Sequence, residues 1–506
     1  MDVRHGCKLV LLVGLIGVMA LSIARGPRPT SRWARPADGV FLVEPYVQLG
    51  DPPGSSAERV AVLWQGADRN ADWSVEARRR ADGPWTRADT PTWRRVAVEG
   101  LEPRRLFRAT VSGLIPGSEF AYRVRCGGVP VFEARARARK AAGQPHRFVA
   151  FGDGGADTAE QKAVAYQASL ARPDFVMITG DLVYFKGRMA EYLSKFFPIY
   201  NAGRASPTSG APLLRSTPFL VAPGNHDLIE RDLDAVPDAL AYFLVWSLPL
   251  NGPIARAGSA NSPILSGTEP RRRAFLEAAG PAYPRMASYS FDFGDAHWTV
   301  LDTNPYVDWS DPALRAWLER DLAAARRSPW RFVAFHQPPF HSSKAHADEQ
   351  RTRLLVDLFE KYHVAIVFCG HIHNYQRSYP LRFVAERAAD GRAIDPEGRV
   401  KGHWSLDRSF DGRTRTRPVG VIYLVTGAGG ARLYNADQHD DAASWQEFTA
   451  RFISNTHSLT VVDVDASTLT VRQISDRGVE IDRFVVTRPD DNIIDPARPS
   501  ADGGHD

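Results

Sequence analysis

Five short segments with polar residues, each at the end of an apolar run or shortly after it, constrain the fold of this 506-residue chain more than any other feature. The apolar runs span 148–151, 175–179, 219–221, 332–335 and 365–369 and are rich in Val, Ile and Phe, as buried strands are. The polar segments are GDGG (152–155), GDLVY (180–184), GNHD (224–227), FH (335–336) and GHIH (370–373). Because open α/β sheets place ligand sites at the carboxyl ends of their strands, we expect these segments to meet in one site.

From residue 146 onward, apolar strand-like runs alternate with amphipathic helical stretches, which predicts an α/β domain over 146–487. Ser310-Asp311-Pro312 predicts the start of a helix over 313–327, because proline suits the first turn. A second helix is expected over 348–362. Residues 382–418 are rich in Arg and Asp without periodicity, so we interpret them as a surface insertion. Residues 488–506 are rich in Asp, Pro and Gly and predict a disordered tail.

Residues 42–138 predict a small all-β domain, because β-like runs at 59–64, 73–77, 107–111 and 120–124 are separated by Gly, Pro and Asp. The turn at 114–117 resembles that of a fibronectin type III-like sandwich, and Trp64 stands where such a sandwich often buries a tryptophan. Phe120 takes the place of the corner tyrosine of that fold, so the usual hydroxyl tie is missing.

The first 24 residues predict a secretory signal peptide. Arg4 and Lys8 precede an apolar run, and the small residues Ser22 and Ala24 precede a plausible cleavage site. An uncleaved anchor is the alternative, but the run is shorter than the roughly 20 residues that a spanning helix needs. Either outcome places the rest of the chain outside the cytoplasm, secreted or periplasmic, with no stable membrane insertion after cleavage.

Composition excludes few function classes. Hydrophobic residues make up 44% and charged residues 24%, which is typical of a soluble globular protein. The net charge of +5 is mixed with acids along the sequence and gives no indication of nucleic acid binding. Of the three cysteines, Cys7 belongs to the signal peptide, while Cys126 and Cys369 fall in different domains, so we predict two separate buried thiols and no disulfide.

The ordered segments resemble the metallophosphoesterase superfamily and, within it, the purple acid phosphatases, over roughly residues 42–487. Tyr184 stands three residues after Asp181, where that family carries its iron-binding tyrosine. The stretch GHIHNYQRSYP (370–380) resembles the last motif of the family, and 289–294 followed by 297–302 resembles the strand pair before its fourth motif. The resemblance implies a two-sheet β sandwich flanked by helices, whereas periodicity alone gives only α/β.

Carried over residue by residue, the resemblance implies a binuclear metal site bridged by Asp181. The first metal would be held by Asp153, Asp181, Tyr184 and His373, and the second by Asp181, Asn225, His336 and His371. Carboxylates and a phenolate suit Fe(III), while an amide and two imidazoles suit a divalent Zn, Fe or Mn ion. Because alternate residues of a strand point to opposite faces, His371 and His373 must lie in a loop to serve both metals.

The resemblance implies an exported acid phosphatase that hydrolyses phosphate monoesters of small molecules by attack of metal-bound hydroxide. His226, beside Asn225, is the strongest candidate to protonate or stabilise the leaving alkoxide. His346, ten residues beyond His336, is the second candidate, and His341 competes with it. Two departures from the family pattern, Asn374 and Gln376, lie close to His373 in the sequence. They are expected to alter the hydrogen bonds that surround the ligands, and the metal affinity, without removing a ligand.

Other functions are compatible with parts of this pattern. A phosphodiesterase or nucleotidase of the same superfamily is the alternative, because the metal core is shared and the loops at 201–217 and 228–285 carry no recognisable substrate code. A non-catalytic surface-binding protein that uses its fibronectin-like domain for adhesion is a third interpretation. The complete ligand set argues against it, since a lapsed enzyme would be free to lose Asp181 or Asn225.

Overall fold

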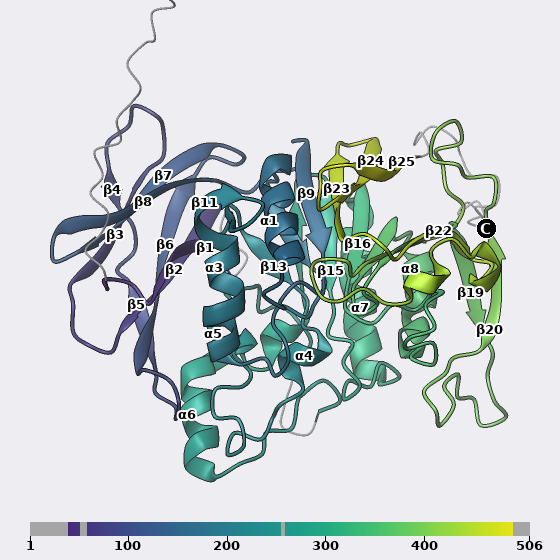
Figure 1. Cartoon of the computed structure of the whole chain (residues 1–506), viewed down its shortest axis with the longest axis horizontal. Helices are drawn as coiled ribbons and strands as arrows, with labels where there is room; N and C mark the ends of the chain where they lie inside the picture. Colours follow the sequence, from purple (N-terminus) through teal and green to yellow (C-terminus); the bar gives the residue numbers. More distant parts are fainter. Residues whose placement is uncertain (1–38, 51–57, 255–258, 489–506) are drawn as a thin grey trace, which may run out of the picture. The chain divides into compact units, whose positions relative to one another are not determined.

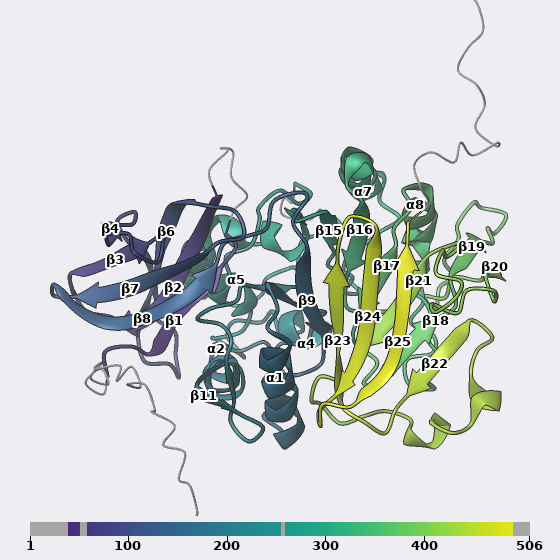
Figure 2. The same ribbon diagram turned by 90° about the horizontal axis from the view of Figure 1, so that it is seen from above.

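The computed structural model describes residues 39–50, 58–254 and 259–488 (Figures 1 and 2). The predicted signal peptide and, apart from Arg488, the predicted disordered tail lie outside these residues. Within the described ranges, none of the helices combines the length and the apolarity needed to cross a bilayer.

The first strands form two four-stranded antiparallel sheets (Figure 2). One sheet has the order β1 (Val43–Gln48), β2 (Glu58–Ala67), β6 (Arg104–Leu114), β5 (Thr92–Val96). The other has the order β4 (Thr86–Arg87), β3 (Trp73–Arg78), β7 (Glu119–Cys126), β8 (Val129–Arg137). The core between them holds Trp64, stacked on Phe107 with ring centroids 5.2 Å apart. This all-β arrangement fits a fibronectin-like domain.

Hydrogen bonds tie this β region to the chain that follows it. Phe120 is buried and has no hydroxyl, as the sequence indicated, but Tyr122 lies two residues later on the same strand. Its hydroxyl donates to the carbonyl of Arg215 at 2.8 Å. The hydroxyl of Tyr46 donates to the carbonyl of Val245 at 2.5 Å. The tyrosine ties therefore join the β region to the later part of the chain.

A six-stranded sheet carries three of the five apolar runs. Its order is β13 (Phe219–Val221), β10 (Phe175–Ile178), β9 (His146–Phe151), β23 (Ser458–Val464), β24 (Thr468–Ser475), β25 (Glu480–Thr487). The strands β13, β10 and β9 are parallel, whereas β23, β24 and β25 join as an antiparallel extension. The parallel strands therefore end at one edge.

The other two runs lie in a seven-stranded sheet. Its order is β14 (Tyr289–Phe293), β15 (Ala296–Val300), β16 (Trp330–Ala334), β17 (Ile366–Cys369), β21 (Ile422–Thr426), β18 (Tyr375–Ser378), β22 (Thr449–Ile453). The strands β15, β16, β17 and β21 are parallel, and β14 pairs with β15 as the expected antiparallel strand pair. Two-stranded sheets are formed by β11 (Asn201–Ser206) with β12 (Gly210–Pro212) and by β19 (Leu381–Ala385) with β20 (Gly402–Leu406).

The two large sheets pack face to face through aromatic side chains. Phe148 of β9 lies 4.8 Å from Trp298 of β15, 5.7 Å from Phe332 of β16 and 5.6 Å from Phe368 of β17, measured between ring centroids. Burial of rings of this size is a main source of folding free energy. The two-sheet sandwich expected from the resemblance is confirmed.

Helices flank the sandwich on both sides (Figures 1 and 2). Helix α1 (Ala159–Ala171) lies against β23 and β24. On the seven-stranded sheet, α7 (Pro312–Ala324) and α8 (Val356–Lys361) pack Leu318 and Phe359 into one core with Val333 and Val367. The other α-helices are α2 (Met189–Glu191), α3 (Phe197–Tyr200), α4 (Asn225–Leu228), α5 (Tyr242–Val245) and α6 (Glu269–Ala279).

The two helices predicted from the sequence have different outcomes. The start of α7 is as expected, since the Asp311 carboxylate accepts from the N–H groups of Ala313 and Leu314. The expected helix over 348–362 is wrong at its start, because a 3₁₀ turn at Arg351–Leu355 precedes α8. Residues 345–348 form a turn, and Glu349 directly after it contacts two histidines.

The two described cysteines are free, as predicted, and only one of them is fully buried. Cys369 is 1% exposed at the end of β17. Cys126, at the end of β7, is only partly buried. No disulfide therefore contributes to stability in the described part of the chain.

Candidate metal centre

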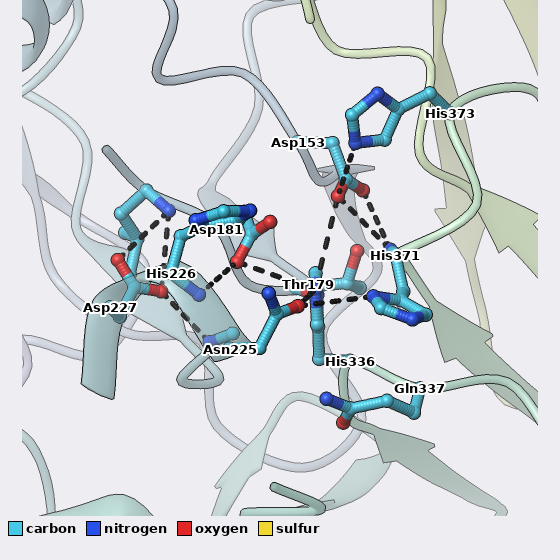
Figure 3. A network of polar contacts seen from close by, with 12 residues as sticks. Asp153, Thr179, Asp181, Asn225, His226, Asp227, His336, Gln337, His371 and His373 are labelled. Carbon is cyan, nitrogen blue, oxygen red and sulfur yellow. Dashed lines mark hydrogen bonds and ion pairs between the residues drawn. The ribbon is translucent and has the colours of Figure 1, made fainter. Parts of the chain in front are cut away.

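The five polar segments meet at the carboxyl ends of β9, β10, β13, β16 and β17, where the sequence predicted them (Figure 3). At the centre, ligand atoms of Asp153, Asp181 and His336 all lie within 4.8 Å of one another, and all three residues are buried. Two carboxylates and an imidazole at this spacing have the donor chemistry of a metal site. The cluster is therefore able to hold a cation.

One side of the site brings Tyr184 and His373 onto Asp153. The Tyr184 hydroxyl donates to Asp153 Oδ1 at 3.3 Å and lies 3.0 Å from His373 Nε2. The same ring nitrogen lies 3.4 Å from Asp153 Oδ1. The structure thus assembles the phenol, imidazole and carboxylate expected for a first metal.

The other side brings two histidines onto Asn225. The Asn225 Oδ1 atom lies 3.0 Å from His336 Nε2 and 3.1 Å from His371 Nδ1. His336 Nε2 also lies 3.4 Å from Asp181 Oδ1 and 3.9 Å from Asp153 Oδ1. His336 therefore connects the two sides, and all seven predicted ligands belong to one continuous set of contacts.

Each of the three histidines directs one ring nitrogen into the site and holds the other outside it. His336 Nδ1 lies 2.8 Å from the carbonyl of Thr179, and His373 Nδ1 lies 2.8 Å from the carbonyl of Arg432. His371 is turned the other way, with Nε2 2.9 Å from the Glu349 carboxylate. A carbonyl or carboxylate partner holds a proton on the outer nitrogen, so the inner nitrogen is the one that is placed to bind a metal.

Three of the predicted ligands have a left-handed backbone. The φ angles are 59° at Asp153, 52° at Asp181 and 68° at His371. This conformation is unfavourable for residues with a Cβ, although Asp tolerates it better than most. The backbone N–H of His371 donates to Asp153 Oδ2 at 2.9 Å. This hydrogen bond holds the loop of His371 against the loop of Asp153.

Glycines next to the ligands are required by close approach. A Cβ at Gly224 would lie 2.2 Å from the backbone nitrogen of Asp181, and one at Gly180, where φ is 99°, would lie 2.4 Å from His336 Nδ1. No side chain fits at either distance. The glycine that opens the segments at 180 and 224 therefore lets the ligand loops touch.

Negative charge dominates the electrostatics of the buried cluster. Burial alone would lower the pKa of His336, but Asp181 and Asp153 raise it to about 10. Burial would raise the pKa of Asp181, yet His336, with His226 and His371, holds that pKa below its usual range. Burial, Asp181 and Asp153 raise the pKa of the Tyr184 hydroxyl well above its ordinary value. The pocket thus favours positive charge between its two carboxylates.

Asp227 is a buried carboxylate to which the sequence gave no role. Its oxygens accept from the N–H of Leu182 at 3.1 Å and from the N–H of Gly224 at 2.8 Å. Burial, followed by the charge of Asp181, raises its pKa to about 8. Asp227 therefore ties the loop of Asp181 to the loop of Asn225. Its place in the GNHD segment was the available signal.

The two histidines predicted to act in catalysis border the cluster. His226 donates its backbone N–H to Asp181 Oδ1 at 3.0 Å, and its Nδ1 lies 2.9 Å from the carbonyl of Phe185. The His346 ring lies 4.2 Å from the His371 ring, measured between centroids. His341, the competitor of His346, is less exposed than His346, and burial lowers its pKa to about 3.

Two further residues border the site without any sequence signal. Glu349 lies 2.6 Å from His346 Nδ1 and 2.9 Å from His371 Nε2, so one carboxylate holds both rings. The ring of Tyr434 stacks on His373 at a centroid distance of 4.0 Å and an interplanar angle of 11°. Glu349 lies in a loop before the 370–373 segment and Tyr434 in a loop after it. Because neither residue belongs to a motif, the sequence pattern did not indicate these contacts.

The side chains of Asn374 and Gln376 hydrogen-bond to each other, and their expected effect on metal affinity stays a prediction. Gln376 accepts from the N–H of Ser342 at 2.7 Å and donates to Asn374 Oδ1 at 3.0 Å. No hydrogen bond within the described chain joins either side chain to His373. The pair instead supports the segment that leads to His346.

The part of the chain that carries this site is similar to known proteins. Residues 146–375 match the family model described as calcineurin-like phosphoesterase. Purple acid phosphatase 23 of Arabidopsis thaliana is 26% identical over 376 residues, which cover 69% of this chain and 72% of that protein. An uncharacterized protein of Mycobacterium tuberculosis strain H37Rv is 26% identical over 358 residues, covering 64% of this chain and 58% of that protein.

Solved structures give the same fold. The structure of purple acid phosphatase PPD1 from yellow lupin seeds superposes with a TM-score of 0.61 at 18% identity, covering 88% of this chain and 74% of that one. The structure of PhoD gives a TM-score of 0.53 at 13% identity, covering 92% and 90%. The chain therefore contains a calcineurin-like phosphoesterase domain and is related to the purple acid phosphatases.

Proposed function

We propose that this chain is an exported phosphatase with two metal ions that hydrolyses phosphate monoesters of small molecules. The observation that carries the proposal is the convergence of seven donor side chains from five separate loops. Their donor atoms face one another inside a calcineurin-like phosphoesterase domain, and the resemblance to the purple acid phosphatases implies two metals.

The donors divide into the two sets expected from the sequence. Asp153, Asp181, Tyr184 and His373 would hold Fe(III), because carboxylates and a phenol are hard donors. Asp181, Asn225, His336 and His371 would hold a divalent Zn, Fe or Mn ion. When bound, the two cations would neutralise phosphoryl oxygens and supply the nucleophile at mild pH.

The remaining chemistry belongs to side chains at the rim. The departing alkoxide of a phosphate ester needs a proton or a neighbouring positive charge. His226 is suited to this role because its Nδ1 is engaged by the Phe185 carbonyl, which leaves Nε2 for the leaving oxygen. His346 is placed similarly, with Nδ1 on the Glu349 carboxylate.

The domain organisation and the location are part of the same proposal. A fibronectin type III-like domain over 42–138 would precede the catalytic domain over 146–487, with the signal peptide over 1–24 removed on export. The support for export is the basic start, the apolar run and the small residues before position 25. Secretion or a periplasmic location would be seen as a mature chain beginning near Arg25.

One assay tests the proposed activity. Purified, metal-loaded protein is given an aryl phosphate monoester and the matched diester in parallel, and the same assay is run on Asp181→Asn. As a control, Asp440→Asn changes an aspartate whose side chain is 98% exposed. We expect faster turnover of the monoester, a loss in Asp181→Asn and none in Asp440→Asn. Faster turnover of the diester would favour a phosphodiesterase, and no turnover of either would favour a non-catalytic protein.

A further inference from the structure

A second concave site lies apart from the metal centre. A groove of about 2050 Å³ is lined by the starts of β16, β17 and β21, by β19 and by the last described residues of the chain. The candidate ligands follow the carboxyl ends of β16 and β17, so the groove lies at the opposite ends of these strands. Whatever binds there does not compete directly with a substrate at the metal centre.

The groove is strongly basic. Its lining contains ten Arg and Lys side chains against five Asp and Glu. This excess of five positive charges equals the net charge of the whole chain. Among its basic side chains are those of Arg382, Arg387, Arg392, Arg417 and Arg488. We call this site the arginine groove.

Some of these basic side chains hold backbone segments together, and others are exposed to solvent. Arg331 and Arg353 donate to backbone carbonyls, including that of Tyr362 at 2.6 Å and that of Pro339 at 2.8 Å, so these two hold loops together. Arg382 is exposed on β19, and its guanidinium makes no hydrogen bond or ion pair within the described chain. Such a guanidinium is suited to pair with a carboxylate from elsewhere.

Two apolar side chains lie among these charges. Val384, on the same face of β19 as Arg382, is 70% exposed, and Val419 is 57% exposed, and both line the groove. An occupant that fits this surface carries acidic groups interspersed with aliphatic ones. An isolated phosphate ion would leave the two valines uncovered.

The chain itself supplies such a segment. Arg488, the last described residue, lines the arginine groove, and the sequence continues as PDDNIID over 489–495. Residues 489–506 contain five Asp and one Arg, a net charge of −4 with His neutral. The first seven of them combine three aspartates with Ile493 and Ile494.

We propose that residues 489–495 bind in the arginine groove, with Asp490 and Asp491 paired to Arg382 and Arg417 and the two isoleucines covering Val384 and Val419. A segment joined to the rim of its own site binds at a high effective concentration, so weak individual contacts suffice. Opposite charges select the partner and fix its direction. The inference is independent of the proposed phosphatase activity.

The full-length chain tests this through the distance between two spin labels. One label is placed at Ala324, an exposed residue at the end of α7 outside the groove lining, and one at Ala497. The background carries Cys7→Ser and Cys126→Ser, and Cys369 is buried. Nine unbound residues beyond Arg488 would sample distances over roughly 30 Å. We therefore expect a narrow distance distribution that broadens in the Arg382→Glu/Arg417→Glu variant and at high salt.

Matched variants make the result decisive. Arg413→Glu reverses an exposed arginine of the same loop outside the lining and should leave the distribution narrow. Adding Asp490→Arg/Asp491→Arg to the Arg382→Glu/Arg417→Glu variant should restore the narrow distance distribution. Turnover of an aryl phosphate should stay within about twofold in all of them, since neither groove arginine touches the metal centre.

Two results would overturn the proposal. One is a broad distribution in the unmodified chain, and the other is a narrow distribution that survives in the Arg382→Glu/Arg417→Glu variant. In the first case, inorganic polyphosphate is titrated into the unmodified chain. Binding that is lost in Arg382→Glu/Arg417→Glu would assign the arginine groove to an external anion.

Discussion

The carboxylate of Asp227 accepts a hydrogen bond from the backbone N–H of Leu182, 3.1 Å away and 45 residues earlier in the chain. Since Leu182 follows Asp181 and Asp227 follows His226, this contact sets the distance between two of the loops that carry proposed ligands. With the bond from Gly224, it makes Asp227 a buried support beneath the metal centre.

We predict that Asp227→Ala lowers both stability and metal affinity. The change leaves the N–H groups of Leu182 and Gly224 buried without acceptors, at about 1–3 kcal/mol each. Thermal unfolding and metal content of the purified variant measure the two effects. Asp440→Ala, an exposed change, should alter neither. Full metal content and an unchanged Tm in Asp227→Ala would show that the loops keep their spacing without this carboxylate.

Replacing His226 tests the rim chemistry. We expect His226→Ala to lower kcat by about 10²–10⁴-fold, the range for loss of a general acid or charge stabiliser, with both metals retained. His346→Ala should cost less. If His341→Ala proves more damaging than His346→Ala, the assignment of the second histidine is wrong.

Glu349 provides a prediction that the sequence did not. Because its carboxylate holds His346 and His371, we expect Glu349→Gln to lower kcat by about 10-fold and to weaken binding of the second metal, by loss of a charge-assisted hydrogen bond to the ligand. Metal titration measures the affinity. Glu447→Gln, at an exposed position, is the control. Unchanged metal affinity would restrict Glu349 to a role at His346.

The colour of the protein tests the proposed iron site. A phenolate on Fe(III) absorbs visible light, so native protein should be pink to purple and most active below neutral pH. Tyr184→Phe keeps the ring and removes the oxygen, so the absorption band should disappear while circular dichroism stays unchanged. A colourless, fully active protein with two divalent metals would show that Tyr184 does not bind iron.

His297, which lies away from the metal centre, is expected to make the folded state less stable at alkaline pH. The ring lies between Asp292 and Asp321, which outweigh the effect of burial and raise its pKa to about 9. A pKa above the unfolded value of about 6.5 stabilises the folded state fully below pH 6.5, and this contribution is lost as pH rises through 9.

The expected size of the effect follows from the same shift. Because the Asp292 side chain is 71% exposed, we expect only about 1–2 kcal/mol. Urea unfolding between pH 6 and pH 9.5 should show this loss in the native chain and not in His297→Gln. Parallel curves for the two proteins would contradict the prediction.

The strands were predictable because each combines β-branched and aromatic residues with a polar end. The run at 219–221 coincides with β13, and the runs at 175–179 and 365–369 differ from β10 and β17 by one residue. The start of α8 was not predictable, because Glu349 and its neighbours are recruited by His371, 22 residues further along the chain. Tertiary contact overrides helix propensity at that point.

The candidate ligands could be named from the sequence, but their support could not. Asp153, Asp181 and the two last histidines stand in recognisable motifs, whereas Tyr434 reaches His373 by a loop of no particular pattern. The reach of Gln376 to Ser342 likewise depends on how two distant loops pack. Short sequence motifs therefore indicate which residues are candidate ligands, whereas the contacts that orient those side chains depend on how distant loops pack.

The left-handed backbone of Asp153, Asp181 and His371 decides how an inactive form of this protein should be made. Alanine at these positions removes the ligand atom and also adds backbone strain of roughly 1–2 kcal/mol. A loss of activity in such a variant could then come either from the missing ligand or from a distorted loop. Asparagine tolerates the same conformation and keeps the shape of aspartate. Asp153→Asn and Asp181→Asn are therefore the variants in which an uncleaved substrate is best captured for crystallography.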